Sequence, residues 1–224
     1  MFGKNPKRPA INGEVDALDV QEIFATIQGE GPNAGTPAVF VRLGGCNLAC
    51  SFCDTEFESY SAIKIDEIIQ EIKEKSLNKN NIRTHNLVVI TGGEPMRQPI
   101  EEFCKKLLEE KFSVQIETNG TIFRDLDSRV QIICSPKNIS KYSRIREDLL
   151  PKITAFKFLI SAFDEKYYSV QEIGQADYNI PVYVQPIDDY NEQKNQANLL
   201  KTIEIARENN YKISLQIHKY MNIP

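Results

Sequence analysis

The sequence predicts an α/β fold, and three observations support this prediction. Short runs of β-branched and aromatic residues recur along the chain, as in buried parallel strands. Patterns typical of helices lie between these runs. At 224 residues the chain fits one domain, residues 1–224, with a core of its own. The predicted strands are 20–26, 38–43, 87–90, 114–118, 130–134, 156–160, 182–185 and 213–217.

Three segments between these strands place apolar residues three and four positions apart. This spacing puts the apolar side chains on one face of a helix, which can then pack against a sheet. The three stripes are Ile65, Ile68, Ile69 and Ile72; Ile100, Phe103, Cys104, Leu107 and Leu108; and Leu199, Leu200, Ile203 and Ala206.

The length of the chain beyond residue 37 indicates which α/β fold it forms. At roughly 30 residues per βα unit, this part holds about six units. A closed eightfold barrel usually takes about 250 residues. We therefore expect an incomplete (β/α) barrel of about six βα units, with an open doubly wound sheet as the structural alternative. The loops at the carboxyl ends of the strands would carry the chemistry.

The composition argues against several classes of protein. Lys and Arg together number 27 against 31 Asp and Glu, a net charge of −4, so the broad basic surface of a nucleic-acid-binding protein is not expected. No stretch approaches the ~20 apolar residues of a membrane span, and the N-terminal residues do not resemble a signal peptide. We expect a cytoplasmic protein with a small-molecule or protein partner, and neither nucleic acid nor membrane as a partner.

Three of the five cysteines, Cys46, Cys50 and Cys53, lie within eight positions and follow a predicted strand. Their short spacing lets one loop curl around a cuboidal iron–sulfur cluster with all three sulfurs facing inward. Three ligands leave one of four irons without a protein ligand, where another molecule can bind. The alternative is a structural zinc ion, which needs a fourth ligand. Candidates for that ligand are His85, His218 and Cys104.

A second loop that could take part in chemistry follows the predicted strand 87–90 directly. Its sequence is Thr91-Gly92-Gly93-Glu94-Pro95. Two glycines at the end of a strand allow close approach to the main chain, and Glu94 is an anionic acceptor suited to an ammonium group. A Gly-Gly turn before proline is by itself mostly structural. Together with the three-cysteine loop upstream, however, this turn is a much more specific sign of a functional site.

These two loops resemble those of the radical S-adenosylmethionine (radical SAM) enzymes. The resemblance implies a [4Fe-4S] cluster on Cys46, Cys50 and Cys53, carried by a cluster loop at residues 44–55. It also implies that S-adenosylmethionine chelates the open iron and is cleaved by one electron, with its amino group on the Gly-Gly-Glu segment. The implied cofactor contacts are Phe52, Cys53, Asp54, Gly93, Glu94, Ser135, Pro136, Lys137, Gln185 and Asp188.

Segments outside this shared core are similar to the members of this family that contract a pterin ring in deazapurine and queuosine biosynthesis, and the match spans nearly the whole chain. It implies a carbon–nitrogen lyase that converts 6-carboxy-5,6,7,8-tetrahydropterin to 7-carboxy-7-deazaguanine and releases ammonia. Catalytic roles are implied for Glu30, Arg42 and His218. Implied substrate contacts are Ile27, Gln28, Gly29, Glu30, Arg42, Thr91, His218 and the terminal carboxylate of Pro224, within a C-terminal segment 216–224.

The same resemblance implies Mg²⁺ at the hydroxyl of Thr55, because a hydroxyl together with substrate oxygens suits this hard ion. It further implies an electron donor such as flavodoxin or ferredoxin, and a homodimer. Two other functions compete with this interpretation. One is a radical activase that abstracts hydrogen from a protein glycine, and the other is a non-catalytic binding module stabilised by zinc.

Overall fold

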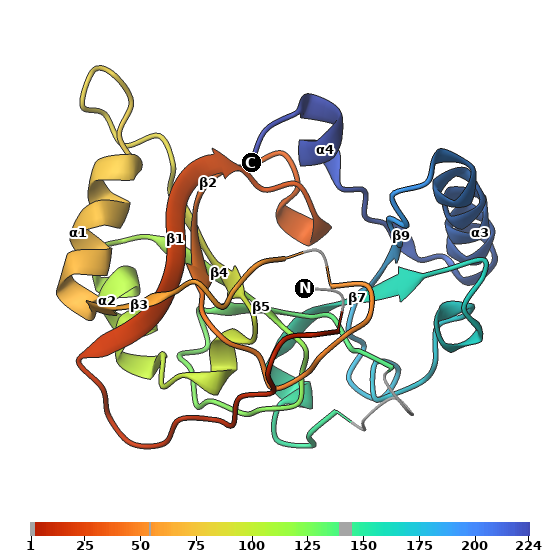
Figure 1. Ribbon diagram of the computed structural model, residues 1–224, viewed down its shortest axis with the longest axis horizontal. Coiled ribbons are helices and arrows are strands. Elements are labelled where there is room, and N and C mark those ends of the chain that lie inside the picture. The colour runs from red at the N-terminus through yellow and green to blue at the C-terminus, as the bar shows by residue number, and fades with distance from the viewer. Residues whose placement is uncertain (1–2, 54, 139–144) are drawn as a thin grey trace. The chain divides into compact units, whose positions relative to one another are not determined.

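A computed structural model of the chain describes residues 3–53, 55–138 and 145–224 (Figure 1). The expected cofactor residue Asp54 lies outside the described residues. The chain divides into two compact units. The first unit comprises Met1–Gln28, Thr36–Thr118 and Ile122–Ile132, and the second comprises Gly29–Gly35, Asn119–Thr121 and Ile133–Pro224. The single domain 1–224 expected from the sequence stays a prediction.

The first unit is built on strands that are antiparallel at one edge and parallel beyond it. β1 (Ala17–Ile27) pairs antiparallel with β3 (Ser61–Lys64) and with β2 (Pro37–Leu43). β2 pairs parallel with β4 (Leu87–Gly92), and β4 pairs parallel with β5 (Ser113–Thr118). The parallel pairs bring the carboxyl ends of β2, β4 and β5 to the same edge, where their loops carry most of the expected site residues of this unit.

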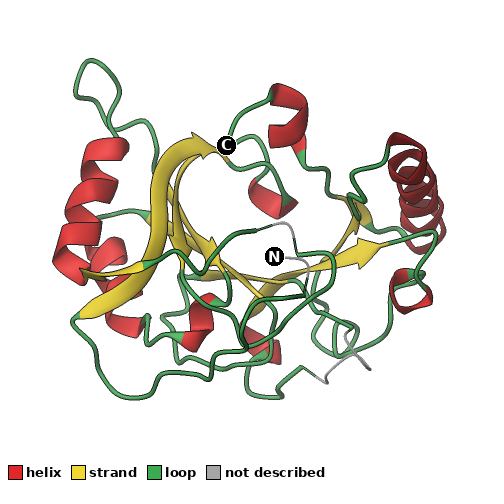
Figure 2. Ribbon diagram, in the orientation of Figure 1, coloured by secondary structure: helices red, strands yellow, loops and turns green. Residues whose placement is uncertain are grey.

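Two helices of the first unit form where apolar stripes predicted them. α1 (Ile65–Lys75) begins with acidic residues and ends with basic ones, an order that complements the helix dipole, and its buried side chains are the four predicted isoleucines. α2 (Glu101–Glu109) buries Phe103, Cys104 and Leu107. Figure 2 shows both helices beside the strands of this unit.

The second unit continues the parallel pattern. β7 (Ile153–Ile160) pairs with β8 (Val182–Pro186), and β8 pairs with the short β9 (Lys212–Ile213). α3 (Glu192–Asn209) connects β8 to β9, and α4 (Ile217–Met221) follows near the end of the chain. β6 (Gln131–Cys134) spans the division between the units. Hydrogen-bonded neighbours follow the order β3-β1-β2-β4-β5 in the first unit and β7-β8-β9 in the second.

The mostly parallel strand pairs within each unit confirm the predicted fold class. The helical parts of the βα units are less regular than expected, because among the described residues the connections β5–β6, β6–β7 and β7–β8 contain no α-helix. Short 3₁₀ helices occur instead in two of these connections and in two earlier loops. They are η1 (Gly31–Asn33), η2 (Pro95–Arg97), η3 (Leu150–Lys152) and η4 (Glu165–Tyr167).

Seven predicted strands are present, but the predicted strand 213–217 is wrong. The strand ends at Ile213, and the main chain then turns into α4 at Ile217. Beyond Ile213 the chain bonds to the segment after β1 instead of to a strand, because Ser214 Oγ accepts the N–H of Gly31 at 2.9 Å and the Ile217 N–H donates to Gly29 O at 3.1 Å. β3 was not predicted, since three of its four residues are exposed and it carries no apolar run.

The buried face of α3 also differs from the predicted stripe. Leu200 is 58% exposed, whereas Asn198, Thr202, Ile205 and Ala206 are buried. The amide of Asn198 donates to Ile187 O and Asp189 Oδ2 and accepts from Ala162 N–H, at 2.8–2.9 Å. Because this buried amide is hydrogen-bonded on both sides, it fixes the rotation of the helix more firmly than the apolar stripe does.

No helix among the described residues is both long enough and apolar enough to cross a membrane.

Candidate active site

The cluster loop leaves β2 through Gly44 and Gly45, and the second glycine is required by both backbone and space. Gly45 has φ +75°, in the left-handed region that favours glycine. A Cβ atom there would lie 2.8 Å from Arg8 Cδ and 2.9 Å from Arg97 Nε. The chain therefore turns sharply at the carboxyl end of the strand and presents Cys46 immediately afterwards.

All five cysteines lie in the described residues and none forms a disulfide. Cys46 is buried, whereas Cys50 and Cys53 are half-buried, and the Cys53 N–H donates to Cys50 O at 3.2 Å. The pKa of the Cys46 thiol is raised to about 12, chiefly by burial and also by the charges of Glu94, Cys50 and Cys53. The N–H of Leu48 donates to the sulfur and acts in the opposite direction. All three cysteines belong to the same short loop, and a cationic cluster bound there would stabilise their thiolate forms.

No group of three or more His, Cys, Asp or Glu side chains in residues 3–53, 55–138 and 145–224 is placed to hold a single metal ion. Cys104 is instead buried on α2 within an apolar surrounding that raises the pKa of its thiol.

The Gly-Gly-Glu loop is locked onto the cluster loop by main-chain hydrogen bonds. The N–H groups of Gly93 and Glu94 donate to Leu43 O and Gly45 O, both at 3.0 Å. A Cβ on Gly92 would lie 2.1 Å from Leu43 O, and one on Gly93 would lie 2.0 Å from Gly45 O. The absence of a side chain at Gly92 and Gly93 therefore lets this loop approach the main chain of residues 43–45 closely. The expected contact of Gly93 with a cofactor stays a prediction.

Glu94 is fully buried. Its Oε1 accepts the N–H of Met96 at 3.0 Å and the hydroxyl of Thr118 at 2.7 Å, which caps η2 and joins the end of β4 to the end of β5. The carboxylate thus holds two loops at the same strand edge together.

Two expected substrate residues are neighbours on adjacent strands. In the parallel pairing of β2 with β4, Arg42 lies opposite Thr91, so both side chains share one face of the sheet. The Arg42 guanidinium forms an ion pair with Glu22 at 2.6 Å and lies 5.6 Å from the centre of the Phe24 ring. With 23% of its side chain exposed, Arg42 remains accessible from this face.

Glu117 lies at the end of β5 and was not assigned a role from the sequence. Its Oε1 accepts from Gln115 at 2.8 Å and from the expected substrate residue Gln28 at 3.3 Å. The signal that could have revealed it was a carboxylate at the carboxyl end of a predicted strand, directly before Thr118.

The expected catalytic residue Glu30 is the centre of a hydrogen-bond network within the second unit. Lys157 Nζ donates to Glu30 Oε2, and Gln216 Nε2 donates to Glu30 Oε1 at 2.9 Å. Burial alone would raise the pKa of Glu30, but the charge and hydrogen bond of Lys157, with hydrogen bonds from Gln216 and Gln185, lower it to about 2. Glu30 is therefore a carboxylate at neutral pH.

Lys157 was also missed by sequence reasoning, whereas Gln216 lies in the expected C-terminal segment 216–224 but received no role of its own. Lys157 stands in the otherwise apolar strand Phe156-Lys157-Phe158, and a single lysine inside a buried strand is the signal that could have identified it. No local pattern could have paired Gln216 with Glu30, because the two residues are 186 positions apart in the sequence.

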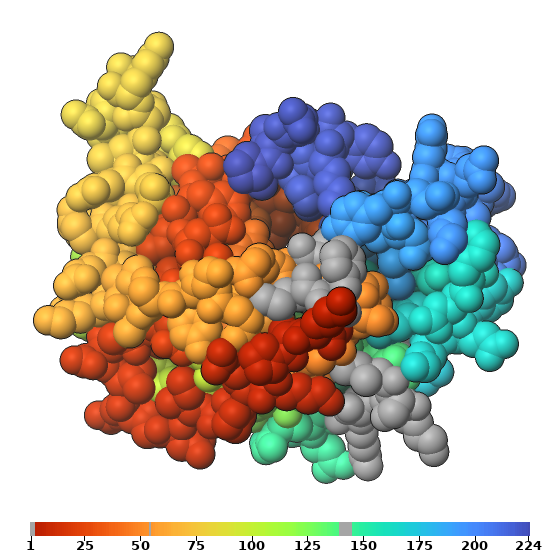
Figure 3. Space-filling model, viewed as in Figure 1, coloured from red at the N-terminus to blue at the C-terminus, as the bar shows by residue number. Residues whose placement is uncertain are grey.

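The segment around Gly29 is tied to the C-terminal residues. The N–H of Gly31 donates to Ser214 Oγ at 2.9 Å, and the N–H of Ile217 donates to Gly29 O at 3.1 Å. A Cβ on Gly29 would lie 2.1 Å from His218 Nδ1. Two expected substrate residues, Gly29 and His218, are thus in direct contact, and α4 lies at the surface with no buried residue (Figure 3).

The expected cofactor residues of the second unit are held by their own neighbours. Lys137 Nζ donates to Ser135 Oγ at 2.5 Å. Asp188 accepts from Lys219 at 2.5 Å and from Asn195 at 2.7 Å. Burial would raise the pKa of Asp188, but these donors and the N–H of Tyr190 leave it below its ordinary value.

The two units divide the expected site residues between them. The first unit contains Ile27, Gln28, Arg42, Cys46, Cys50, Phe52, Cys53, Thr55, Thr91, Gly93 and Glu94. The second contains Gly29, Glu30, Ser135, Pro136, Lys137, Gln185, Asp188, His218 and Pro224.

Comparison with known proteins identifies the family. The chain is 53% identical over 224 residues to a 7-carboxy-7-deazaguanine synthase of Rickettsia prowazekii, across 100% of this chain and 96% of the relative. It is 38% identical over 244 residues to the enzyme of that name from Rhodospirillum rubrum, across 100% of both. The chain belongs to the 7-carboxy-7-deazaguanine synthase family.

Membership of this family agrees with two further comparisons. Residues 40–143 match the model of the radical SAM superfamily. The crystal structure of QueE from Escherichia coli is similar to this fold, with a TM-score of 0.69 and 25% identity over 89% of this chain and 93% of that one. The protein is thus an enzyme of the radical SAM type, whose family uses a [4Fe-4S] cluster and S-adenosylmethionine. Three thiols within eight positions of one loop, none of them joined in a disulfide, fit that cluster.

Proposed function

We propose that the protein converts 6-carboxy-5,6,7,8-tetrahydropterin to 7-carboxy-7-deazaguanine, with release of ammonia, as a step in queuosine biosynthesis. The observation that carries this proposal is 53% identity to a synthase of that name across the whole chain, including the cysteine loop and the C-terminal segment. When bound, the cluster and S-adenosylmethionine supply one-electron radical chemistry. The residues of the chain bind and orient the reactants.

In the first unit, Cys46, Cys50 and Cys53 would hold the cluster. Arg42 and Thr91 project from the same face of neighbouring strands, which supports a role for both in substrate binding. A guanidinium suits the carboxylate of the pterin, because it offers two parallel N–H donors. The ion pair with Glu22 would keep Arg42 oriented until that carboxylate binds.

Phe52 would contact the adenine ring of S-adenosylmethionine, and Thr55 would supply a hydroxyl ligand to Mg²⁺. Both side chains are half-buried on the cluster loop. A hydroxyl and a substrate carboxylate are hard oxygen ligands, and Mg²⁺ keeps few protein ligands.

In the second unit, Glu30 would accept hydrogen bonds from the N–H groups of the pterin, since it is a carboxylate at neutral pH. The contact of His218 with Gly29 supports a shared substrate-binding role for these residues. The terminal carboxylate of Pro224 would accept N–H groups of the same ring. Ser135, Lys137, Gln185 and Asp188 would bind the polar groups of S-adenosylmethionine.

Three further proposals concern the setting of the enzyme. A low-potential electron donor such as flavodoxin or ferredoxin would reduce the cluster. The protein would act in the cytoplasm, where a reducing environment keeps cysteine thiols available for a cluster. It would be a homodimer, which a measurement of the mass in solution tests.

The reaction is tested with anaerobically reconstituted protein, S-adenosylmethionine, a chemical reductant, Mg²⁺ and the carboxypterin. We expect formation of 7-carboxy-7-deazaguanine and one ammonia per product, detected by mass spectrometry. Omission of Mg²⁺ should lower the rate if Thr55 holds this ion. If reduced, cluster-loaded protein forms no deazapurine, the proposal is wrong.

A C-terminal extension separates the proposed synthase from a radical activase. The synthase would lose affinity for the pterin when residues are added after Pro224, because the terminal carboxylate moves away from the ring. An activase, whose substrate is a protein glycine, would tolerate the extension. A rise in KM for the pterin with an unchanged iron content supports the synthase.

A further inference from the structure

The N-terminal strap, defined as residues 3–11, runs along the cluster loop within the first unit. The main-chain N–H of Arg8 donates to Cys46 O at 2.8 Å, and Lys7 forms an isolated β-bridge with Cys46. The side-chain amide of Asn5 donates to Leu48 O at 2.8 Å. The strap thus contacts the main chain of the first expected cluster ligand and of a residue within the loop.

The strap also follows the loop toward its centre. Gly3 has φ +74°, and a Cβ there would lie 3.4 Å from Ser51 Cα and 3.5 Å from Ala49 O. Asn5 is buried, although its neighbours Lys4 and Pro6 are exposed. Because the Asn5 side chain is buried between exposed neighbours, this part of the strap packs against the cluster loop.

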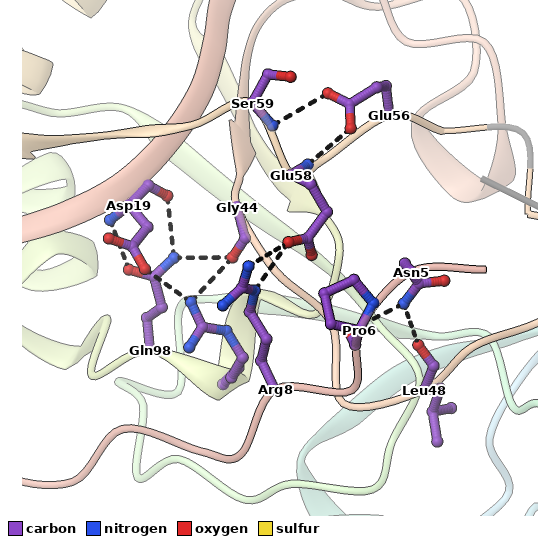
Figure 4. A network of polar contacts seen from close by, with 11 residues as sticks. Asn5, Pro6, Arg8, Asp19, Gly44, Leu48, Glu56, Glu58, Ser59 and Gln98 are labelled. Carbon is purple, nitrogen blue, oxygen red and sulfur yellow. Dashed lines mark hydrogen bonds and ion pairs between the residues drawn. The ribbon is translucent and has the colours of Figure 1, made fainter. Parts of the chain in front are cut away.

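An ion pair anchors the strap beyond the far end of the cluster loop. Arg8 donates to Glu58 Oε2 from Nε at 2.9 Å and from Nη2 at 2.5 Å. Glu58 follows Cys53 by five positions, and the adjoining Phe57 accepts from Gly45 N–H at 2.8 Å. Figure 4 shows the Arg8 side chain directed at the carboxylate of Glu58. Because the Arg8 N–H also donates to Cys46 O, Arg8 joins the beginning of the loop to the segment after the last cysteine.

A second anchor joins the strap to the turn that follows Glu94. The Ile11 N–H donates to Arg97 O at 2.7 Å, and Arg124 Nη2 donates to Ile11 O at 2.5 Å. Arg97 itself donates to Asp19 Oδ2 at 2.8 Å and to Gly44 O at 3.1 Å. Ile11 is thus bonded to Arg97, a residue that also holds the start of the cluster loop at Gly44.

We propose that the N-terminal strap is a positioning element for the iron–sulfur cluster, and that Arg8 and Asn5 hold the cysteine loop closed around it. This inference rests on the proposed cluster site at Cys46, Cys50 and Cys53. The hydrogen bonds at Cys46 O and Leu48 O oppose opening of the loop, and the Arg8–Glu58 ion pair keeps its two ends together. Loss of these contacts frees the loop to open, which exposes the thiols before a cluster is loaded and releases iron faster afterwards.

The test compares Arg8→Met and Asn5→Leu with Arg129→Met in the full-length protein. Arg129 is a matched control, because it also donates from Nε and Nη2 to one carboxylate, that of Asp127. This ion pair does not involve the cluster loop. Two measurements are made. The first is the rate at which N-ethylmaleimide alkylates each cysteine of the metal-free, reduced protein, and the second is the rate at which a ferrous chelator removes iron from the reconstituted protein.

We expect Arg8→Met and Asn5→Leu to raise alkylation of Cys46 and iron loss about fivefold each, as the loss of one or two hydrogen bonds implies. Arg129→Met should leave both rates at the wild-type value. Cys104 and Cys134, which are buried outside the loop, report on global opening and should keep their rates in all variants. Equal rates for the Arg8 and Arg129 variants would overturn the proposal, as would equal acceleration at Cys46 and Cys104.

A charge exchange separates loss of the anchor from loss of the fold. The double variant Arg8→Glu with Glu58→Arg restores an ion pair of opposite polarity. Its rates of Cys46 alkylation and iron loss should therefore return at least halfway from those of Arg8→Glu alone to those of the wild type. If the rates do not return at all, the ion pair does not position the loop. The alkylation measurement needs neither cluster nor substrate, so its outcome stands even if the reconstituted protein forms no deazapurine.

Discussion

Lys157 and Glu30 form an ion pair within the second unit, and only 6% and 17% of their side chains are exposed. Lys157 comes from β7, whereas Glu30 precedes η1, so the pair joins a strand to the segment that carries Gly29. Taking two charges out of water is costly, and their attraction offsets that cost only while both are present. The pair therefore makes each partner depend on the other.

Replacing Lys157 with methionine should destabilise the protein strongly. The variant Lys157→Met keeps the length of the side chain but leaves the Glu30 carboxylate without its cation, at a cost of about 3–5 kcal/mol in the free energy of unfolding. Urea unfolding of the metal-free protein measures this loss. As a control, Lys73→Met removes one partner of the exposed Lys73–Glu110 pair and should cost at most about 1 kcal/mol.

The double variant Lys157→Met with Glu30→Gln tests the cause of that loss. It removes both charges, so it should be more stable than Lys157→Met alone. If the double variant is as unstable as the single one, packing of the lysine stem is responsible instead of the unpaired carboxylate.

The same pair predicts a dependence of stability on acid. The pKa of Glu30 is lowered from 4.5 to about 2 on folding, so its contribution to stability is present above pH 4.5 and is lost as the pH falls toward 2. The shift from 4.5 to about 2 corresponds to about 3 kcal/mol. The wild type should therefore lose more stability than Glu30→Gln across this range, measured by urea unfolding at each pH. Parallel curves for the two proteins would contradict this linkage.

The sequence predicted the features whose signals are local. The C-x3-C-x2-C spacing placed Cys46, Cys50 and Cys53 on one loop, and strand composition located seven of the strands that support the site. Spacing of Ile65, Ile68, Ile69 and Ile72 predicted the buried face of α1. In each case the residues that decide the structure are neighbours along the chain.

The features that the sequence did not predict depend on contacts between distant segments. Lys157 and Glu30 are 127 positions apart, so their pairing follows from the packing of strands and not from any local pattern. The buried face of α3 carries Asn198, whose partners Ala162 and Ile187 lie in the loops that follow β7 and β8. The N-terminal strap carries no periodic signal, and its contacts with distant residues such as Cys46, Leu48 and Glu58 reveal it.

Substitution of Gly29 by alanine should displace His218. A Cβ at this position would lie 2.1 Å from Nδ1 and 3.1 Å from Cβ of His218, so the ring has to move or the main chain has to shift. We expect Gly29→Ala to lower the free energy of unfolding by about 1–3 kcal/mol, the usual cost of overpacking. Under the proposed function it should also raise KM for the pterin.

The effect of Gly29→Ala is checked in a double-mutant cycle with His218→Ala. Removing the imidazole removes the contact at 2.1 Å and leaves only the tight approach to Cβ at 3.1 Å, so Gly29→Ala should cost clearly less stability in the His218→Ala background. An equal loss in both backgrounds would place the conflict elsewhere, for example in the hydrogen bond between Ile217 and Gly29.

Cysteine substitutions should separate the cluster ligands from the structural cysteines. Cys46→Ser, Cys50→Ser and Cys53→Ser should each lower the iron bound after anaerobic reconstitution to below about a tenth of the wild-type amount, since a [4Fe-4S] cluster depends on cysteine thiolates. Cys104→Ala should retain the wild-type iron content and lose only stability, because its side chain is buried in an apolar surrounding on α2. Iron, sulfide and zinc are measured together, so zinc bound in place of iron by the wild type would favour the zinc-stabilised module. Full iron loading of all three serine variants would move the cluster away from this loop.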